Sequence, residues 1–113
     1  MTSDLTQKKC TPCEGGTAPL TKEEAREYLS HLDQWELRGD VSSIQRTTSF
    51  NNFKEALEFV NDIGAVAESE GHHPDILLHG YKRVSITLTT HAIGGLSEND
   101  FILAAKIDSL LEE

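Results

Sequence analysis

The sequence predicts an α+β domain in which a four-stranded antiparallel sheet is covered on one face by three helices. One observation is the order of the hydrophobic patterns, which follow one another as helix, strand, strand, helix, strand, strand, helix. The other is that consecutive strands are joined by only a few residues. Such short connections form antiparallel hairpins, and helices between and beside two hairpins can cover one face of a shared sheet.

Each predicted helix begins at a residue that can cap its N-terminus. Thr21 and Glu24 have the spacing of a capping box, in which the hydroxyl and the carboxylate each accept a backbone N–H. The second helix begins after Asn52 and ends at Gly71, which suits a left-handed C-terminal residue. The third begins at Ser97. The apolar face of the second helix is predicted to comprise Phe53, Leu57, Val60, Gly64 and Ala67, widened by Ala56, Ile63 and Val66.

Four segments have the pattern of strands. Residues 35–38 alternate apolar and polar, residues 39–40 form a turn, and residues 43–50 complete the first hairpin. Residues 75–80 and 83–90 form the second hairpin, whose last strand alternates clearly enough to be buried on one face. The exposed edges of such a sheet need covering, and oligomerisation is one way to cover them.

Size and charge restrict the possible partners. The chain has 113 residues, which suits a single domain, and a formal net charge of −9. Such a field repels nucleic-acid backbones and anionic membrane surfaces, so neither is an expected partner. The apolar runs fall far short of the ~20 residues that span a bilayer. The polar N-terminus does not resemble a secretory signal, and we expect a cytoplasmic protein.

The first 19 residues form a separate segment of different composition. They hold two of the three prolines and a glycine pair but no hydrophobic period, which predicts an extended arm (residues 1–19) before the domain (residues 20–113). Cys10 and Cys13 are the only cysteines, too few for a disulfide framework, which favours a reducing compartment. Their CxxC spacing fits a redox couple, half of a zinc site, or reduced thiols on a flexible arm.

Three histidines flank the second predicted hairpin. His72 and His73 precede its first strand, and His91 follows its second. Because these two ends of an antiparallel hairpin lie side by side, His72 or His73 should approach His91. Imidazoles with ordinary pKa values near 6.5 suit general acid/base work, such as a dehydration, but also zinc binding or a structural role. Neighbours on an extended chain point in opposite directions, which argues against His72 and His73 sharing an ion.

A longer pattern resembles the signature of the pterin-4a-carbinolamine dehydratase family. Glu68 is followed after three positions by His72-His73-Pro74, then after six by Tyr81, after nine by His91 and after eight by Asp100. The flanking stretches TLTTHAIGGLSENDF and AAKID are also similar to the family. The resemblance extends over roughly residues 20–111, and the CTPC of the arm resembles an extension found in some prokaryotic members. It implies the same fold as the hydrophobic patterns.

The resemblance implies the loss of water from 4a-hydroxytetrahydropterin to give quinonoid dihydropterin, as in the recycling of tetrahydrobiopterin-type cofactors. It implies no metal, and no organic cofactor beyond the pterin substrate. His72, His73 and His91 correspond to the family's catalytic histidines, with His72 and His91 predicted to transfer protons and His73 to assist binding. The residues predicted to line the pterin pocket are Glu68, Pro74, Thr90, Ala92, Ile93 and Asp100.

Some of these residues also have simpler interpretations. Asp100 lies three residues after Ser97 and can complete a capping box, a role that we favour over an influence on His91. Glu68 can be a solvated residue of the second helix. His72 can serve as a C-terminal cap that offsets the helix dipole.

The resemblance also implies a homodimer or homotetramer, and it leaves a second class of function open. Animal members of the family stabilise dimers of a homeodomain transcription factor on the same scaffold, so a protein-interaction module is the alternative to an enzyme. The complete set of three histidines favours the enzyme, because a scaffold alone would not need it.

Overall fold

The computed structural model describes residues 3–8, 10, 18–32 and 34–111. The order predicted from the sequence is confirmed from α2 to α4. The helices are α1 (Ser3–Thr6), α2 (Lys22–Leu29), α3 (Phe53–Glu70) and α4 (Glu98–Leu111), with a 3₁₀ turn η1 (His91–Ile93), and the strands are β1 (Glu36–Arg38), β2 (Ser43–Ser49), β3 (Asp75–His79) and β4 (Arg83–Leu88).

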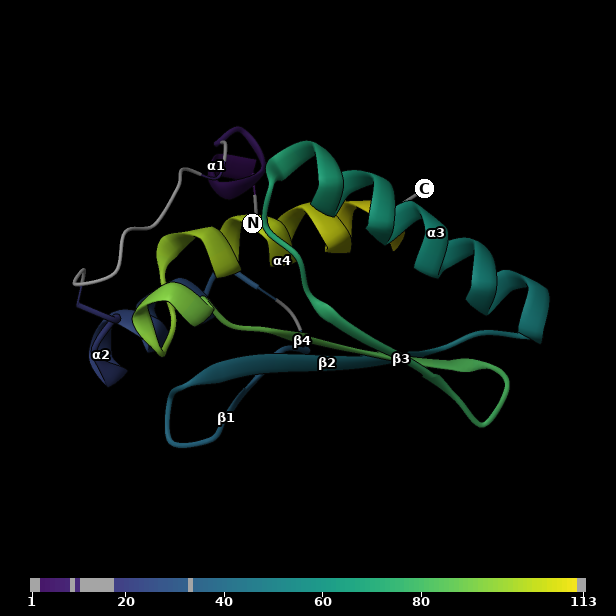
Figure 1. Cartoon of the computed structure of the whole chain (residues 1–113), viewed down its shortest axis with the longest axis horizontal. Coiled ribbons are helices and arrows are strands. Elements are labelled where there is room, and N and C mark those ends of the chain that lie inside the picture. The colour runs from purple at the N-terminus through teal and green to yellow at the C-terminus, as the bar shows by residue number, and fades with distance from the viewer. Residues whose placement is uncertain (1–2, 9, 11–17, 33, 112–113) are drawn as a thin grey trace.

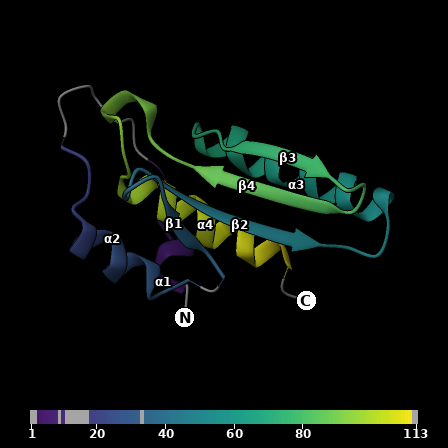
Figure 2. The ribbon, with the colours of Figure 1, turned by 90° about the horizontal axis from the view of Figure 1, so that it is seen from below.

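All neighbouring strands of the sheet are antiparallel, in the order β1-β2-β4-β3. The two predicted hairpins therefore join along β2 and β4, where Arg46 pairs with Ile86. Figure 1 shows α3 and α4 on one face of this sheet, and in Figure 2 none of the described helices covers the opposite face. The fold places the start of β3 and the end of β4 beside the α3 C-terminus and the α4 N-terminus.

The core lies between the sheet and helices α3 and α4. Helix α4 is its centre, and every residue from Asn99 to Ala105 is buried. This burial explains why α4 is apolar around most of its circumference, since α3 packs on one side of it and the sheet on the other. Among the helices of the described residues, none is both long and apolar enough to cross a membrane. The largest fully buried apolar side chains are those of Phe101, Ile44, Ile63, Ile86, Leu88, Leu96, Ile102, Leu103 and Ile107.

The predicted caps at Thr21 and Asn52 are present, but the predicted face of α3 is wrong in part. Thr21 forms the complete capping box, and the Asn52 side chain accepts the backbone N–H of Glu55. The buried stripe of α3 is Ala56, Phe59, Ile63 and Ala67. Phe53 and Leu57, predicted to be inside, are 50% and 42% exposed. The sequence pattern is ambiguous because both stripes are apolar. The structure buries the stripe that contains Phe59, whose ring packs against that of Phe50 with 5.1 Å between the centroids.

The N-terminal segment differs from the extended arm that was predicted. Residues Ser3–Thr6 form a helical turn, and Leu5, only 5% exposed, joins the core cluster. A single apolar residue carries no periodicity, so the sequence did not indicate this turn. Cys13 and the rest of residues 11–17 lie outside the described residues, and the domain boundary after residue 19 stays a prediction.

Candidate active site

The end of α3 positions the first two histidines. Gly71 adopts the left-handed conformation (φ 67°) and is the C-cap, as predicted, and its N–H bonds back to the Ala67 and Glu68 carbonyls. The His72 N–H also bonds to the Ala67 carbonyl, at 3.3 Å. These bonds satisfy carbonyls that the helix end leaves without partners. Pro74 then keeps the backbone extended into β3.

The second hairpin brings the third histidine to the same place. Asp75 pairs with Thr87, and extending this register backwards along β3 sets His72 opposite Thr90. Thr90 and Gly95 form a bridge, with the Thr90 N–H bonded to the Gly95 carbonyl at 2.9 Å, and η1 between them carries His91. A Cβ on Gly95 would lie 2.7 Å from the Pro19 side chain, so glycine is required here for close packing.

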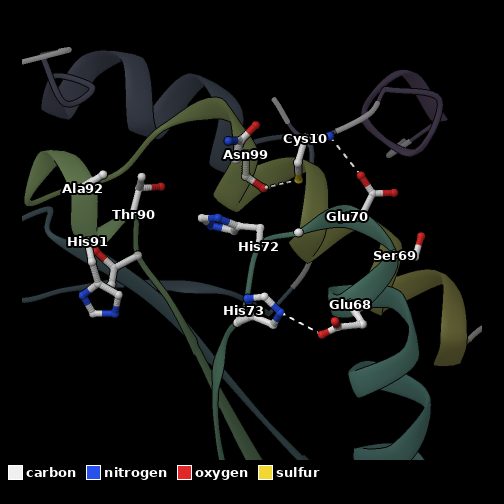
Figure 3. Close-up of a pocket in the computed structure, with 12 residues that line it drawn as sticks. Cys10, Glu68, Ser69, Glu70, His72, His73, Thr90, His91, Ala92 and Asn99 are labelled. Carbon is white, nitrogen blue, oxygen red and sulfur yellow. Dashed lines mark hydrogen bonds and ion pairs between the residues drawn. The ribbon is translucent and has the colours of Figure 1, made fainter. Parts of the chain in front are cut away.

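These elements surround a cavity of about 640 Å³, within the range of small-molecule sites. All three histidines contribute to it, whereas the hairpin argument predicted only that His72 or His73 would approach His91. In Figure 3, His72 lies at the centre of the view, His91 comes from the loop after β4, and His73 lies beside Glu68. The lining residues are Cys10, Glu68, Ser69, Glu70, Gly71, His72, His73, Thr89, Thr90, His91, Ala92 and Asn99.

A buried carboxylate fixes His72. Asp100 is fully buried, and its Oδ1 lies 2.6 Å from His72 Nε2. Its Oδ2 accepts from the Thr90 hydroxyl at 2.8 Å and from the Ser97 N–H at 3.0 Å. Because the carboxylate accepts, the neutral His72 ring donates from Nε2, which assigns Nδ1 as the nitrogen able to accept a proton. This is the arrangement in which a carboxylate orients a catalytic imidazole.

The predicted second role of Asp100 is therefore corrected: its carboxylate bonds His72 rather than His91. The capping role holds in part. Asp100 accepts the Ser97 N–H as an N3 residue of a capping box does, but the Ser97 hydroxyl lies 2.8 Å from that of Thr90. Sequence spacing alone shows the capping box, whereas the contact with His72 depends on how α3 and α4 pack.

The other histidines are more accessible. His73 Nε2 lies 3.0 Å from Glu68 Oε1, and both side chains are largely exposed. His91 is also exposed. His72, at 13% side-chain exposure, is thus the buried member of a set whose other members face open solvent. Such a set can exchange protons with a bound molecule at one ring and with water at another.

Of the predicted pocket residues, Glu68, Thr90 and Ala92 line the cavity, while Pro74, Ile93 and the fully buried Asp100 lie next to lining residues without lining it. The lining residues that sequence reasoning missed are Cys10, Ser69, Glu70, Gly71, Thr89 and Asn99. Asn99 directly precedes Asp100, and Glu70 lies between Glu68 and His72, so their only signal is nearness in sequence to predicted site residues. Cys10 carries no such signal because it is separated from the rest of the cavity by most of the chain.

Burial, and after it the Glu70 carboxylate, raise the pKa of the Cys10 thiol from 9.0 to about 12. In a Cys13→Ser variant, we therefore expect iodoacetamide to alkylate Cys10 about 10²-fold more slowly at pH 8 in the folded protein than in urea. The lower thiolate fraction outweighs the greater nucleophilicity of a more basic thiolate. Mass spectrometry of timed samples measures both rates, and equal rates would contradict the buried, protonated thiol.

Within the part of the chain that the structure describes, no three His, Cys, Asp or Glu side chains gather as metal ligands. His72 and His73 instead bond to different carboxylates, those of Asp100 and Glu68. This fits the expectation that neighbours on an extended chain point apart. The zinc interpretation of the cysteines is not tested, because Cys13 lies outside the described residues.

Comparisons with a family model, with related sequences and with solved structures all lead to the same family. Residues 18–110 match the family model described as pterin 4 alpha carbinolamine dehydratase. A protein from Methylococcus capsulatus, provisionally named pterin-4-alpha-carbinolamine dehydratase, is 53% identical over 110 residues, covering 96% of this chain and 95% of its own. One from Alkaliphilus metalliredigens with the same provisional name is 49% identical over 112 residues, covering 98% and 99%.

Two solved structures are also similar. A transcriptional coactivator/pterin dehydratase from Brucella melitensis superposes with a TM-score of 0.76 at 34% identity, covering 81% of this chain and 97% of that one. A pterin dehydratase-like RuBisCO assembly factor of the alpha-carboxysome gives a TM-score of 0.61 at 26% identity, covering 72% and 93%. By its matching family model, its relatives and its fold, this chain belongs to the pterin-4a-carbinolamine dehydratase family.

Proposed function

We propose that this protein dehydrates 4a-hydroxytetrahydropterins by histidine acid/base catalysis, and that it does so in the recycling of a tetrahydrobiopterin-type cofactor. The observation that carries the proposal is the shared cavity of His72, His73 and His91, in which buried Asp100 orients His72. Family membership supports the substrate class. The cavity volume of about 640 Å³ suits a bicyclic ring with its side chain.

The reaction needs one proton donor and one proton acceptor. A protonated imidazole gives its proton to the 4a-hydroxyl, the C4a–O bond breaks, and water leaves. A neutral imidazole removes the N5 proton, and the electrons of the broken N5–H bond form the C4a=N5 double bond of the quinonoid product. The two proton transfers cancel, so the net charge of the protein is unchanged, and exchange of a proton between the rings through solvent restores the starting protonation state of each ring.

We assign these transfers to His72 and His91, and binding to His73. His72 is held in one orientation by Asp100, which suits a ring that must meet one substrate atom. His91 is exposed at the opposite strand end and can exchange protons with water. His73, paired with exposed Glu68, can turn toward a bound ring at little cost.

The direct test generates 4a-hydroxytetrahydropterin in situ with an aromatic amino-acid hydroxylase and follows formation of the quinonoid product. Wild-type protein should accelerate dehydration well above the spontaneous rate. Heat-denatured protein supplies the baseline. A well-folded wild-type protein that gives no acceleration would refute the proposal.

The proposed chemistry requires no metal ion. We therefore expect prolonged treatment with a strong chelator, followed by elemental analysis, to leave the dehydration rate within about two-fold of that of untreated protein. A rate that collapses and returns with added zinc would instead support metal activation of water.

We also propose that the chain forms a homo-oligomer, as is expected from the family. Phe53 and Leu57 leave half-exposed apolar surface on α3, which a second copy can cover. Light scattering coupled to size-exclusion chromatography should give at least twice the 12.5 kDa chain mass. The double variant Phe53→Ser/Leu57→Ser should lower this mass if α3 forms the interface, and an unchanged mass would place the interface elsewhere.

An interaction module is the second candidate, because the two similar proteins of known structure are described as a transcriptional coactivator/pterin dehydratase and a RuBisCO assembly factor. A stoichiometric protein partner that co-purifies with wild type, together with absence of dehydratase activity, would favour it.

A further inference from the structure

The N-terminal segment is anchored to the catalytic centre by contacts of three kinds. Leu5 lies in the hydrophobic core at 5% exposure. Lys8 forms a 2.6 Å ion pair with Glu98 at the start of α4. This ion pair is exposed and therefore adds little stability. The Cys10 N–H donates to Glu70 Oε1 at 2.9 Å. These contacts direct the segment, defined here as residues 3–8 and 10, across the α3 C-terminus and the α4 N-terminus.

Glu70 is the central anchor. Its side chain is only 5% exposed, and its Oε2 accepts from Lys106 Nζ at 2.6 Å. One carboxylate thus joins α3, α4 and the N-terminal segment, immediately before Gly71 and His72. A buried ion pair of this kind is costly to desolvate, so its attraction adds little net stability, but removing one partner leaves the other charge buried and unpaired.

The anchored segment reaches the cavity at Cys10. The Cys10 thiol lies 3.6 Å from the carbonyl oxygen of Asn99, the residue before Asp100, and both residues line the cavity with His72. In the view of Figure 3, Cys10 and Asn99 lie on one side of His72 and His73 lies on the other. The family model begins only at residue 18, so this part of the wall comes from outside the region that the family model matches.

We propose that the N-terminal segment is a wall of the substrate pocket and that Cys10, held in place by Glu70, is a specificity-determining residue that limits how far a pterin can enter beside His72. The inference rests on the proposed function. A small side chain leaves space beside the ring of His72, and a larger one at the same backbone position would occupy it. The thiol, kept protonated by burial and by Glu70, adds no charge to this wall. Glu70 also lines the cavity, but its carboxylate oxygens accept from the Cys10 N–H and from Lys106, so we assign it the role of a positioning residue for Cys10.

The test compares Cys10→Met with Gln7→Met, which adds the same side chain to the same segment at an exposed position outside the cavity. Calorimetric binding of a stable oxidised pterin, such as biopterin, should be about 10-fold or more weaker for Cys10→Met and unchanged for Gln7→Met. In the dehydration assay, Cys10→Met should raise KM while kcat stays within about two-fold. A merely structural residue would lower the melting temperature without this split.

Glu70 gives an independent comparison. Glu70→Gln keeps an oxygen that can accept the Cys10 N–H, whereas Glu70→Ala removes it. We expect Glu70→Ala to weaken pterin binding several-fold, and Glu70→Gln to recover most of that loss although both variants lose the charge opposite Lys106.

Equal pterin affinity of Cys10→Met and wild type would overturn the inference while leaving the proposed function intact. Absence of pterin binding by folded wild type would instead refute the proposed function, and this inference with it. If Cys10→Met does not fold, Cys10→Val adds less volume at the same position. A folded Cys10→Val variant with wild-type affinity would likewise overturn the inference.

Discussion

Replacing His72 or His91 by alanine is expected to slow dehydration by about 10²-fold or more in each case. Each substitution removes either the group that protonates the departing hydroxyl or the group that accepts the N5 proton. The measurement is kcat/KM with in situ substrate, after subtraction of the spontaneous rate. His79→Ala is the matched control, since His79 bonds to Ser85 at 2.9 Å and lies outside the cavity.

The variant Asp100→Asn tests whether His72 needs the carboxylate that orients it. Asparagine keeps the size of Asp100 but presents an amide in place of one carboxylate oxygen, so the bond to His72 no longer selects one tautomer. We expect kcat to fall about 10-fold or more with a smaller change in KM, because the substrate does not reach the fully buried Asp100. Wild-type kinetics in Asp100→Asn would show that His72 needs no orienting carboxylate. An inactive His79→Ala variant would show that the activity losses of the His72 and His91 variants are unspecific.

The convergence of the histidines could be predicted from the sequence because it depends on local signals. Gly71 ends a helix, Pro74 imposes extended backbone, and a short connection turns the second hairpin. Each signal acts within a few residues, and together they place His72 and His91 at neighbouring strand ends. The family pattern then predicted which three of the five histidines take part in catalysis.

The contacts that hold the site could not be predicted in the same way. The hydrogen bond of Asp100 to His72 and that of Cys10 to Glu70 join residues 28 and 60 positions apart. They depend on the relative placement of α3 and α4, which is set by packing over the whole core. The same reason explains why the buried face of α3 was predicted wrongly in part. Two overlapping apolar stripes were possible, and the structure buries the one that contains Phe59, which packs against Phe50.

A second buried charge cluster, on the far half of α4, should control stability rather than activity. Asp108 Oδ1 accepts from Trp35 Nε1 at 2.9 Å and from Arg46 Nη1 at 2.7 Å. The side chains of Arg46 and Asp108 are only 12% and 7% exposed. Asp108→Ala leaves the Arg46 guanidinium buried and unpaired beside the space that the carboxylate had filled. We expect the free energy of unfolding to fall by about 3–5 kcal/mol. Urea denaturation measures it.

The double variant Arg46→Met/Asp108→Leu tests whether that loss comes from an unpaired buried charge or from lost volume. Removing both charges while filling the space should restore most of the stability, because the desolvation cost of the pair disappears together with its attraction. A double variant as unstable as Asp108→Ala would assign the loss to the Trp35 hydrogen bond and to packing instead. None of these residues lines the cavity of the histidines, so folded variants should keep wild-type kcat. Stability and catalysis would then depend on two different carboxylates of the same helix, Asp108 and Asp100.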